Sequence, residues 1–116
     1  MTWTMEQFIA ALQRLAMPAE PQLASLPDGC CKGDELALDF DNFRRCAGVV
    51  IPSEAIPLVE QLDEMLGAMS GEANAELWTD DAIRQCREWE RVRAKAQEIL
   101  KSMKQEPPQA GGTLRR

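Results

Sequence analysis

Apolar positions recur with a helical period over most of the chain. The first repeat precedes Pro18, and its apolar face is formed by Phe8, Ile9, Leu12, Leu15 and Ala16. Thr4 and Gln7 have the spacing of a capping box, and a proline cannot continue a helix. This pattern predicts an amphipathic helix that begins near Thr4 and ends before Pro18.

Two later segments have the same period. Residues 57–70 place on one face Leu58, Val59, Leu62, Met65, Leu66 and Met69. Residues 79–104 do the same with Ile83, Cys86, Trp89, Val92, Ala96, Ile99, Leu100 and Met103. Pro57 suits a first helical turn, Gly71 a helix end, and Thr79 an N-cap. We expect two amphipathic helices here, and the periodicity makes the second the longest in the chain.

Residues 34–48 fit two interpretations. Leu36, Leu38 and Phe40 alternate with smaller or acidic residues, as in a half-buried strand. A helical face through Leu36, Phe40, Phe43 and Ala47 extends further than this alternation. We therefore favour a helix capped by Asp34 and closed by Gly48, with the strand as the alternative.

The remaining segments lack periodicity. Residues 18–33, PAEPQLASLPDGCCKG, are rich in proline and glycine, and they predict an irregular connection with a short helical turn around Leu23. Residues 105–116 predict a flexible C-terminal tail. The fold class expected is therefore all-α, a compact bundle of about four amphipathic helices with one irregular connection, forming a single domain over residues 1–104.

Charge is unevenly distributed along this chain of 116 residues, whose formal net charge is −6. Residues 34–81 hold twelve acids and two bases, whereas the part from Ala82 onward holds nine bases and four acids. A negative field repels nucleic acids and anionic membranes and attracts basic proteins. The basic row Arg84, Arg87, Arg91 and Lys95 is interrupted by glutamates, which favours a solvated helix face. We expect a protein partner, without nucleic acid or membrane.

The sequence offers little catalytic chemistry. It has no histidine and no C-x-x-C pair, which removes the Ser-His and Cys-His arrangements and the common zinc patterns. Asp39 and Asp41 lack the turn glycine of a calcium loop. Cys30-Cys31-Lys32 is the one candidate for an activated thiol. We expect reduced cysteines, no metal, no cofactor and no enzymatic activity.

The first sixteen residues mix acidic and amide side chains with apolar ones and lack the basic start of a signal peptide. No run of apolar residues is long enough to span a bilayer. The cytoplasm is therefore the expected compartment.

Three blocks of sequence share their order and spacing with a family of small bacterial proteins. The blocks are DELALDFD at 34–41, LDEMLGAMSG at 62–71, and ELWTDDAI at 76–83 followed by WERVR at 89–93. Over residues 34–100 the chain resembles immunity proteins of polymorphic or contact-dependent toxin systems. The resemblance implies an inhibitor that binds one cognate toxin. Members often break the last helix before the position of Trp89, which leaves one helix or two open over residues 80–104.

Charge and helical position together select the residues expected to bind a partner. These are Asp39, Asp41, Glu60, Asp63 and Glu64, together with Trp78, which directly precedes the Thr79 cap. The expected function is neutralisation of a basic toxin domain by occlusion. The alternative is a helical adaptor or regulatory subunit that self-associates, for example as a homodimer. An enzyme that uses a cysteine or a carboxylate pair is a third, less favoured hypothesis.

Overall fold

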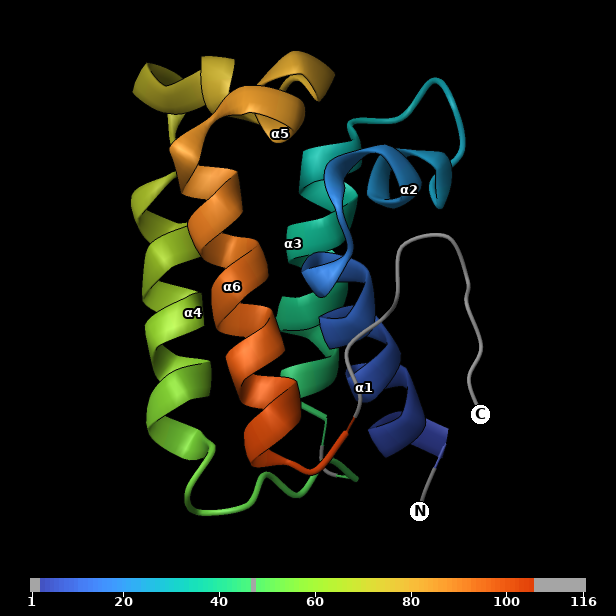
Figure 1. Ribbon diagram of the computed structural model, residues 1–116, viewed down its shortest axis with the longest axis vertical. Coiled ribbons are helices and arrows are strands. Elements are labelled where there is room, and N and C mark those ends of the chain that lie inside the picture. The colour runs from blue at the N-terminus through green and yellow to red at the C-terminus, as the bar shows by residue number, and fades with distance from the viewer. Residues whose placement is uncertain (1–2, 47, 106–116) are drawn as a thin grey trace.

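Four long helices, α1, α3, α4 and α6, run alternately up and down, and shorter helices lie across one end of them (Figure 1). The computed structural model describes residues 3–46 and 48–105, and over these residues it contains helices and no strands. The helices are α1 Trp3–Ala16, α2 Ala19–Ala24, α3 Lys32–Arg44, α4 Ile56–Ala68, the 3-10 helix η1 Glu72–Trp78, α5 Asp80–Gln85 and α6 Arg87–Ser102. The prediction of an all-α fold is confirmed, and segment 34–48 contains a helix rather than a strand.

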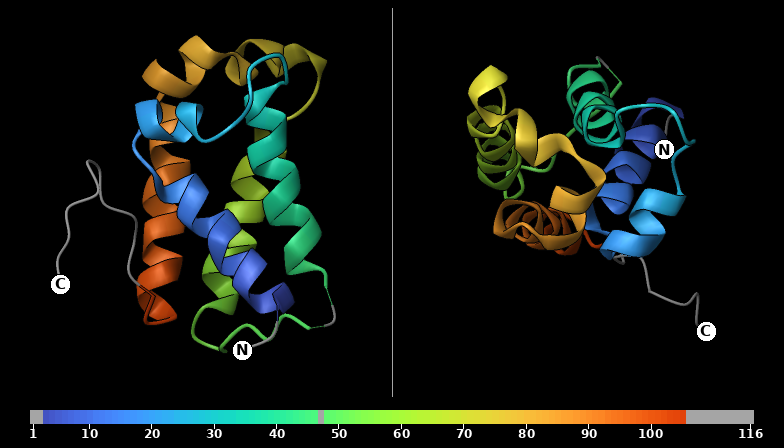
Figure 2. Two further views of the ribbon diagram at one scale, coloured as in Figure 1. Left: turned by 90° about the vertical axis from the view of Figure 1, so that its right-hand side faces the viewer. Right: turned by 90° about the horizontal axis from the view of Figure 1, so that it is seen from above.

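The long helices do not all pack against one another. Helix α1 packs on both α6 and α3, and α6 packs on α4, whereas α3 and α4 are not a closely packed pair. Viewed from above, α3 stands beside α1 and α4 beside α6 (Figure 2). At one end, α5 contacts α2, α3 and η1. The bundle is therefore tightly closed on three sides and less tightly on the fourth.

The predicted apolar faces form the core. The largest side chains buried there include Phe8, Leu12, Phe40, Leu62, Trp89 and Ile99. Phe8 of α1 and Phe40 of α3 stack with their ring centroids 6.1 Å apart. Leu23, from the short turn predicted in the irregular connection, is also buried. Apolar burial at these positions is the main force that joins the four long helices.

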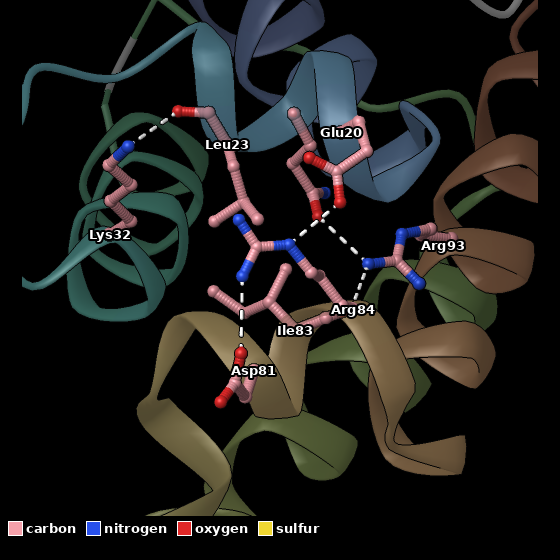
Figure 3. Close-up of polar contacts among 8 residues, drawn as sticks. Glu20, Leu23, Lys32, Asp81, Ile83, Arg84 and Arg93 are labelled. Carbon is pink, nitrogen blue, oxygen red and sulfur yellow. Dashed lines mark hydrogen bonds and ion pairs between the residues drawn. The ribbon is translucent and has the colours of Figure 1, made fainter.

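The end of α1 is capped by side chains from other helices. Gln22 is completely buried, and its side-chain nitrogen Nε2 donates to the backbone carbonyl oxygens of Arg14 and Leu15 at 3.0 and 3.1 Å. The side-chain oxygen Oε1 of Gln22 accepts from Arg93 at 3.1 Å, and Arg93 also donates to the backbone carbonyl of Ile83. Burial lowers the pKa of Arg93. This network ties α1, α2, α5 and α6 together at one end of the bundle. Figure 3 shows the part of it around Arg93 and Ile83.

Several predicted helix ends are wrong. Helix α3 begins at Lys32, and its N-cap is Cys31 rather than Asp34. At this start the Lys32 amine is buried and donates to the carbonyl of Leu23 at 2.9 Å, a contact with the preceding connection that the helical period does not reveal. The same helix ends at Arg44, before the predicted stop at Gly48.

The prediction of a single long helix over residues 79–104 is also wrong. Cys86 has an extended backbone and separates α5 from α6, in agreement with the alternative of two helices. Thr79 does cap α5, since its hydroxyl accepts from the backbone N–H of Ala82 at 3.1 Å. The short helix η1 was not predicted. Of the predicted tail 105–116, residues 106–116 lie outside the described part of the chain.

Candidate protein-binding groove

A groove runs between α3 and α4, on the side of the bundle where the two helices do not pack closely. Its wider part, a hollow of about 640 Å³, lies between the first half of α3 and the segment from Ser70 to Thr79. A narrower part of about 160 Å³ continues toward Asp41 and Asp63. The two parts share Ala37, Leu38 and Ser70, so they form one continuous surface that we call the α3–α4 groove.

The floor of the groove is largely apolar. It is lined by Ala37, Leu38, Leu66, Gly67, Ala75 and Trp78. Leu38 is 52% exposed, although it is a large apolar residue in the middle of a helix. Core residues Leu36 and Phe40 flank it by two positions on either side, so a helix turns Leu38 away from the core. An exposed leucine in a concave apolar surface is typical of a docking site.

Trp78 forms a fixed wall of the wider part. Its indole N–H donates to the carbonyl of Met69 at 2.7 Å, and its ring meets Trp89 edge to face. The absence of a side chain at Gly33 permits this position, because a Cβ there would lie 2.8 Å from the Trp78 ring. Trp78 therefore contributes to both the core boundary and the groove.

The rim of the groove is acidic. Asp34 and Glu72 are exposed at the wide end, and within the described residues neither takes part in an ion pair. At the narrow end, Arg44 lies 3.0 Å from Asp41 and 3.1 Å from Asp63, and so it bridges α3 and α4. The uncompensated negative charge is thus concentrated at the wide end, beside Trp78.

The structure brings together three of the six residues expected to bind a partner. Asp41, Asp63 and Trp78 line the groove. Asp39 instead forms an ion pair with Arg14 of α1 at 2.9 Å, on the side of α3 that faces α1. Glu60 and Glu64 are exposed on α4 and do not line the groove.

The groove also contains three residues that were not among those expected to bind a partner, namely Leu38, Asp34 and Glu72. Leu38 had a visible signal: it is an apolar residue two positions from each of two core residues in a segment that proved helical. Asp34 was assigned to a helix cap. Glu72 lies in the unpredicted η1.

Two of the four bases in the row on the last two helices, Arg84 and Lys95, are engaged within the molecule. Arg84 pairs with Glu20 at 2.7 Å and with Asp81 at 3.2 Å (Figure 3), and the hydrogen bond and charge of Glu20 raise the pKa of Arg84. Lys95 donates to Gln61 and pairs with Glu98. These partners reduce the charge that the row offers to a phosphate backbone.

The residues that the structure describes include no cluster of three or more cysteine, aspartate or glutamate side chains that could hold a metal ion. None of their helices is long and apolar enough to cross a membrane.

Comparisons of the chain with protein-family models, with curated proteins and with solved structures found no match.

Proposed function

We propose that this chain is a small acidic protein-binding protein that holds a basic partner against the α3–α4 groove. The observation that carries the proposal is the combination of an exposed apolar floor at Leu38 with unpaired rim acids at Asp34 and Glu72. Apolar burial supplies affinity, and complementary charge accelerates association and selects the partner. Neither contribution requires chemistry by the protein itself.

The specific role that we propose is that of a cytoplasmic immunity protein, which neutralises a basic toxin domain by occluding it. The support for this role is the resemblance over residues 34–100 together with the negative charge of the groove rim. Many secreted toxic domains, particularly nucleases, are basic. An acidic inhibitor captures such a domain rapidly, because the electrostatic field steers the encounter.

A helical adaptor that self-associates is the second candidate. Its support is a separate pair of exposed apolar residues in and after the connection from α3 to α4, Val50 at 75% and Ile56 at 42% exposure. This connection lies at the end of the bundle opposite α5 (Figure 1). A homodimer formed there would leave the groove open.

The test uses the chain as bait in a lysate of its native host, washed at low and at high salt. The rim variant replaces both Asp34 and Glu72 by lysine, and the matched control replaces Glu6 and Glu54, which are exposed outside the groove. We expect the unmodified chain to retain a toxin fragment at low salt and to retain less of it at high salt. The rim variant should also retain less of the fragment, whereas the control should retain as much as the unmodified chain. Its toxicity on expression should be suppressed by the unmodified chain and by the control.

Recovery of the chain alone, or of housekeeping proteins, would favour the adaptor. Asp34 and Glu72 suit this test better than Asp39 and Asp41. Charge reversal at Asp39 or Asp41 would also break the ion pairs with Arg14 and Arg44 and would mix effects on affinity with effects on stability.

A further inference from the structure

We infer that the occupant of the α3–α4 groove is an amphipathic α-helix of the partner, with an apolar face toward Leu38 and lysine or arginine residues near Asp34 and Glu72. The inference rests on the proposed function, and it specifies which structural element of the partner is bound.

The walls of the groove favour a helix over other peptide conformations. One long wall is α3, and the other is α4 at the narrow end and the segment from Ser70 to Thr79, with the 3-10 helix η1, at the wide end. Backbone groups inside a helix are hydrogen-bonded within that helix. A partner strand needs a free sheet edge, and the described residues contain no strand. Polyproline segments dock on aromatic-lined grooves, whereas Trp78 is the one aromatic side chain beside the largely aliphatic floor of the wider part. Ridges of a third helix, in contrast, fit between two helices by ordinary side-chain packing.

The length of the groove suits a short helix. Along α3, the lining residues extend from Cys31 to Asp41. At a rise of about 1.5 Å per residue, this stretch corresponds to about 15 Å, or about three turns of a partner helix lying alongside. Three turns place three or four apolar side chains on one face, at positions i, i+3 or i+4, and i+7. Leu38 lies in the shared middle of the groove, where the central anchor of such a face would lie.

The charge of the groove specifies the polar face of the partner helix. The narrow end is already neutralised in part, because Arg44 bridges Asp41 and Asp63. At the wide end, no base among the residues that the structure describes forms an ion pair with Asp34 or Glu72, so these acids can pair with a partner. We therefore place the basic residues of the partner helix at the end nearest Trp78.

Two synthetic peptides of identical leucine, lysine, alanine and glutamine composition test the inference on the full chain. In one, the leucines recur at i, i+3, i+4 and i+7; in the other, the order is scrambled so that no apolar face forms. We expect the first to shift the amide resonances of Ala37, Leu38 and Gly71. We also expect it to bind at least about tenfold more tightly than the scrambled peptide, since an apolar face is buried only by the first.

Matched variants locate the binding. Leu38→Glu should lower the affinity for the amphipathic peptide about tenfold. Val50→Glu is an equally drastic change at an exposed apolar residue outside the groove, and it should leave this affinity unchanged. The rim variant D34K/E72K leaves the floor of the groove intact, and it should also lower the affinity for the amphipathic peptide. Circular dichroism verifies that each variant is folded.

Three results would overturn the inference. The first is equal binding of both peptides, which would mean that charge alone attracts them. The second is an absence of peptide binding by a chain that still captures a basic partner from lysate, which would leave the proposed function standing. The third is a homodimer that Leu38→Glu dissociates, which would make a second copy the occupant. A failure of the proposed function would give a different result: the rim variant would reduce the binding of no basic partner.

Discussion

The indole rings of Trp78 and Trp89 meet edge to face, with their centroids 5.4 Å apart and their planes at 88°. Both N–H groups are engaged, with Trp78 donating to Met69 at 2.7 Å and Trp89 to the carbonyl of Leu77 at 2.6 Å. Because these contacts fix the Trp78 ring, the wall that it gives the α3–α4 groove exists before any partner arrives. A preformed wall avoids the entropy cost of ordering it on binding.

Gly33→Ala should destabilise the protein by about 1–2 kcal/mol, because overpacking costs more than the helix propensity of alanine returns. The new Cβ would lie 2.8 Å from the Trp78 ring and 3.3 Å from the Trp89 ring. Urea unfolding measures the loss, and tryptophan fluorescence reports the displaced rings. Gly67→Ala is the matched control, since its Cβ meets no atom within 4 Å inside α4. It should stabilise by about 0.5–1 kcal/mol. Equal effects of the two changes would contradict this account of Gly33.

Gln22→Leu should cost about 2–3 kcal/mol of unfolding free energy, because it keeps the volume but leaves buried polar groups unpaired. The groups that lose a partner are the carbonyls of Arg14 and Leu15 and one N–H of Arg93. Gln85→Leu, at an exposed position on α5, should change stability by less than about 0.5 kcal/mol. A Gln22→Leu protein as stable as the Gln85→Leu control would show that the network contributes nothing.

Cys86→Ser should stabilise the protein by about 0.5–1 kcal/mol, because serine is a favourable N-cap and cysteine is not. Cys86 is the N-cap of α6, and its side chain makes no capping hydrogen bond. Cys46→Ser serves as the comparison, since Cys46 follows the end of α3 and caps no helix start. Thermal unfolding of both variants decides the matter: a gain at Cys46 as large as that at Cys86 would argue against capping.

Arg84 and Arg93 have altered pKa values in the folded protein, but their contributions to the free energy of unfolding should not change with pH around neutrality. Folding raises the pKa of Arg84, so its stabilising contribution is complete below its unfolded pKa and is lost as the pH rises through the folded value. Burial lowers the pKa of Arg93, so the unfolded chain binds that proton more tightly and stability rises with pH in the corresponding window. Both windows are alkaline, because arginine titrates far above neutral pH.

Unfolding free energies of Arg84→Gln and Arg93→Met at about pH 6 and about pH 8 provide the measurement. Each variant should differ from the unmodified protein by the same amount at both values. A difference that changes with pH in this range would mean that another group titrates in contact with these arginines.

The predicted core agrees with the structure because burial leaves a periodic trace in the sequence. Leu12, Leu62 and Val92 were each placed on an apolar face, and each is completely buried. Helix ends depend on tertiary contacts, and such contacts produce no periodic pattern in the sequence. The break at Cys86 falls inside an uninterrupted apolar period, and Arg93 of α6 folds back to bind the carbonyl of Ile83 in α5. Local periodicity cannot reveal that contact.

The candidate site was predicted in part for a similar reason. The acidic middle of the chain was evident from composition, but its charge is distributed by the fold. Arg14 and Arg44 neutralise Asp39, Asp41 and Asp63, whereas no base within residues 3–46 and 48–105 forms an ion pair with Asp34 or Glu72. The pairs Arg14–Asp39 and Arg44–Asp63 join different helices, so they follow from the packing order, which the sequence does not specify. The pair Arg44–Asp41 is local, because its residues lie three positions apart in α3. The groove itself depends on which pair of helices fails to pack.

The loosely packed side of the bundle also bears on how such a protein can diversify. Asp34, Leu38 and Glu72 are exposed, and exchange of such residues usually alters stability by less than about 0.5 kcal/mol. The core on the other sides of α3 and α4 is untouched by these changes. Mutation can therefore remodel the shape and charge of the groove while the fold persists. Under the proposed function, a lineage can follow a changing partner without first acquiring compensating substitutions.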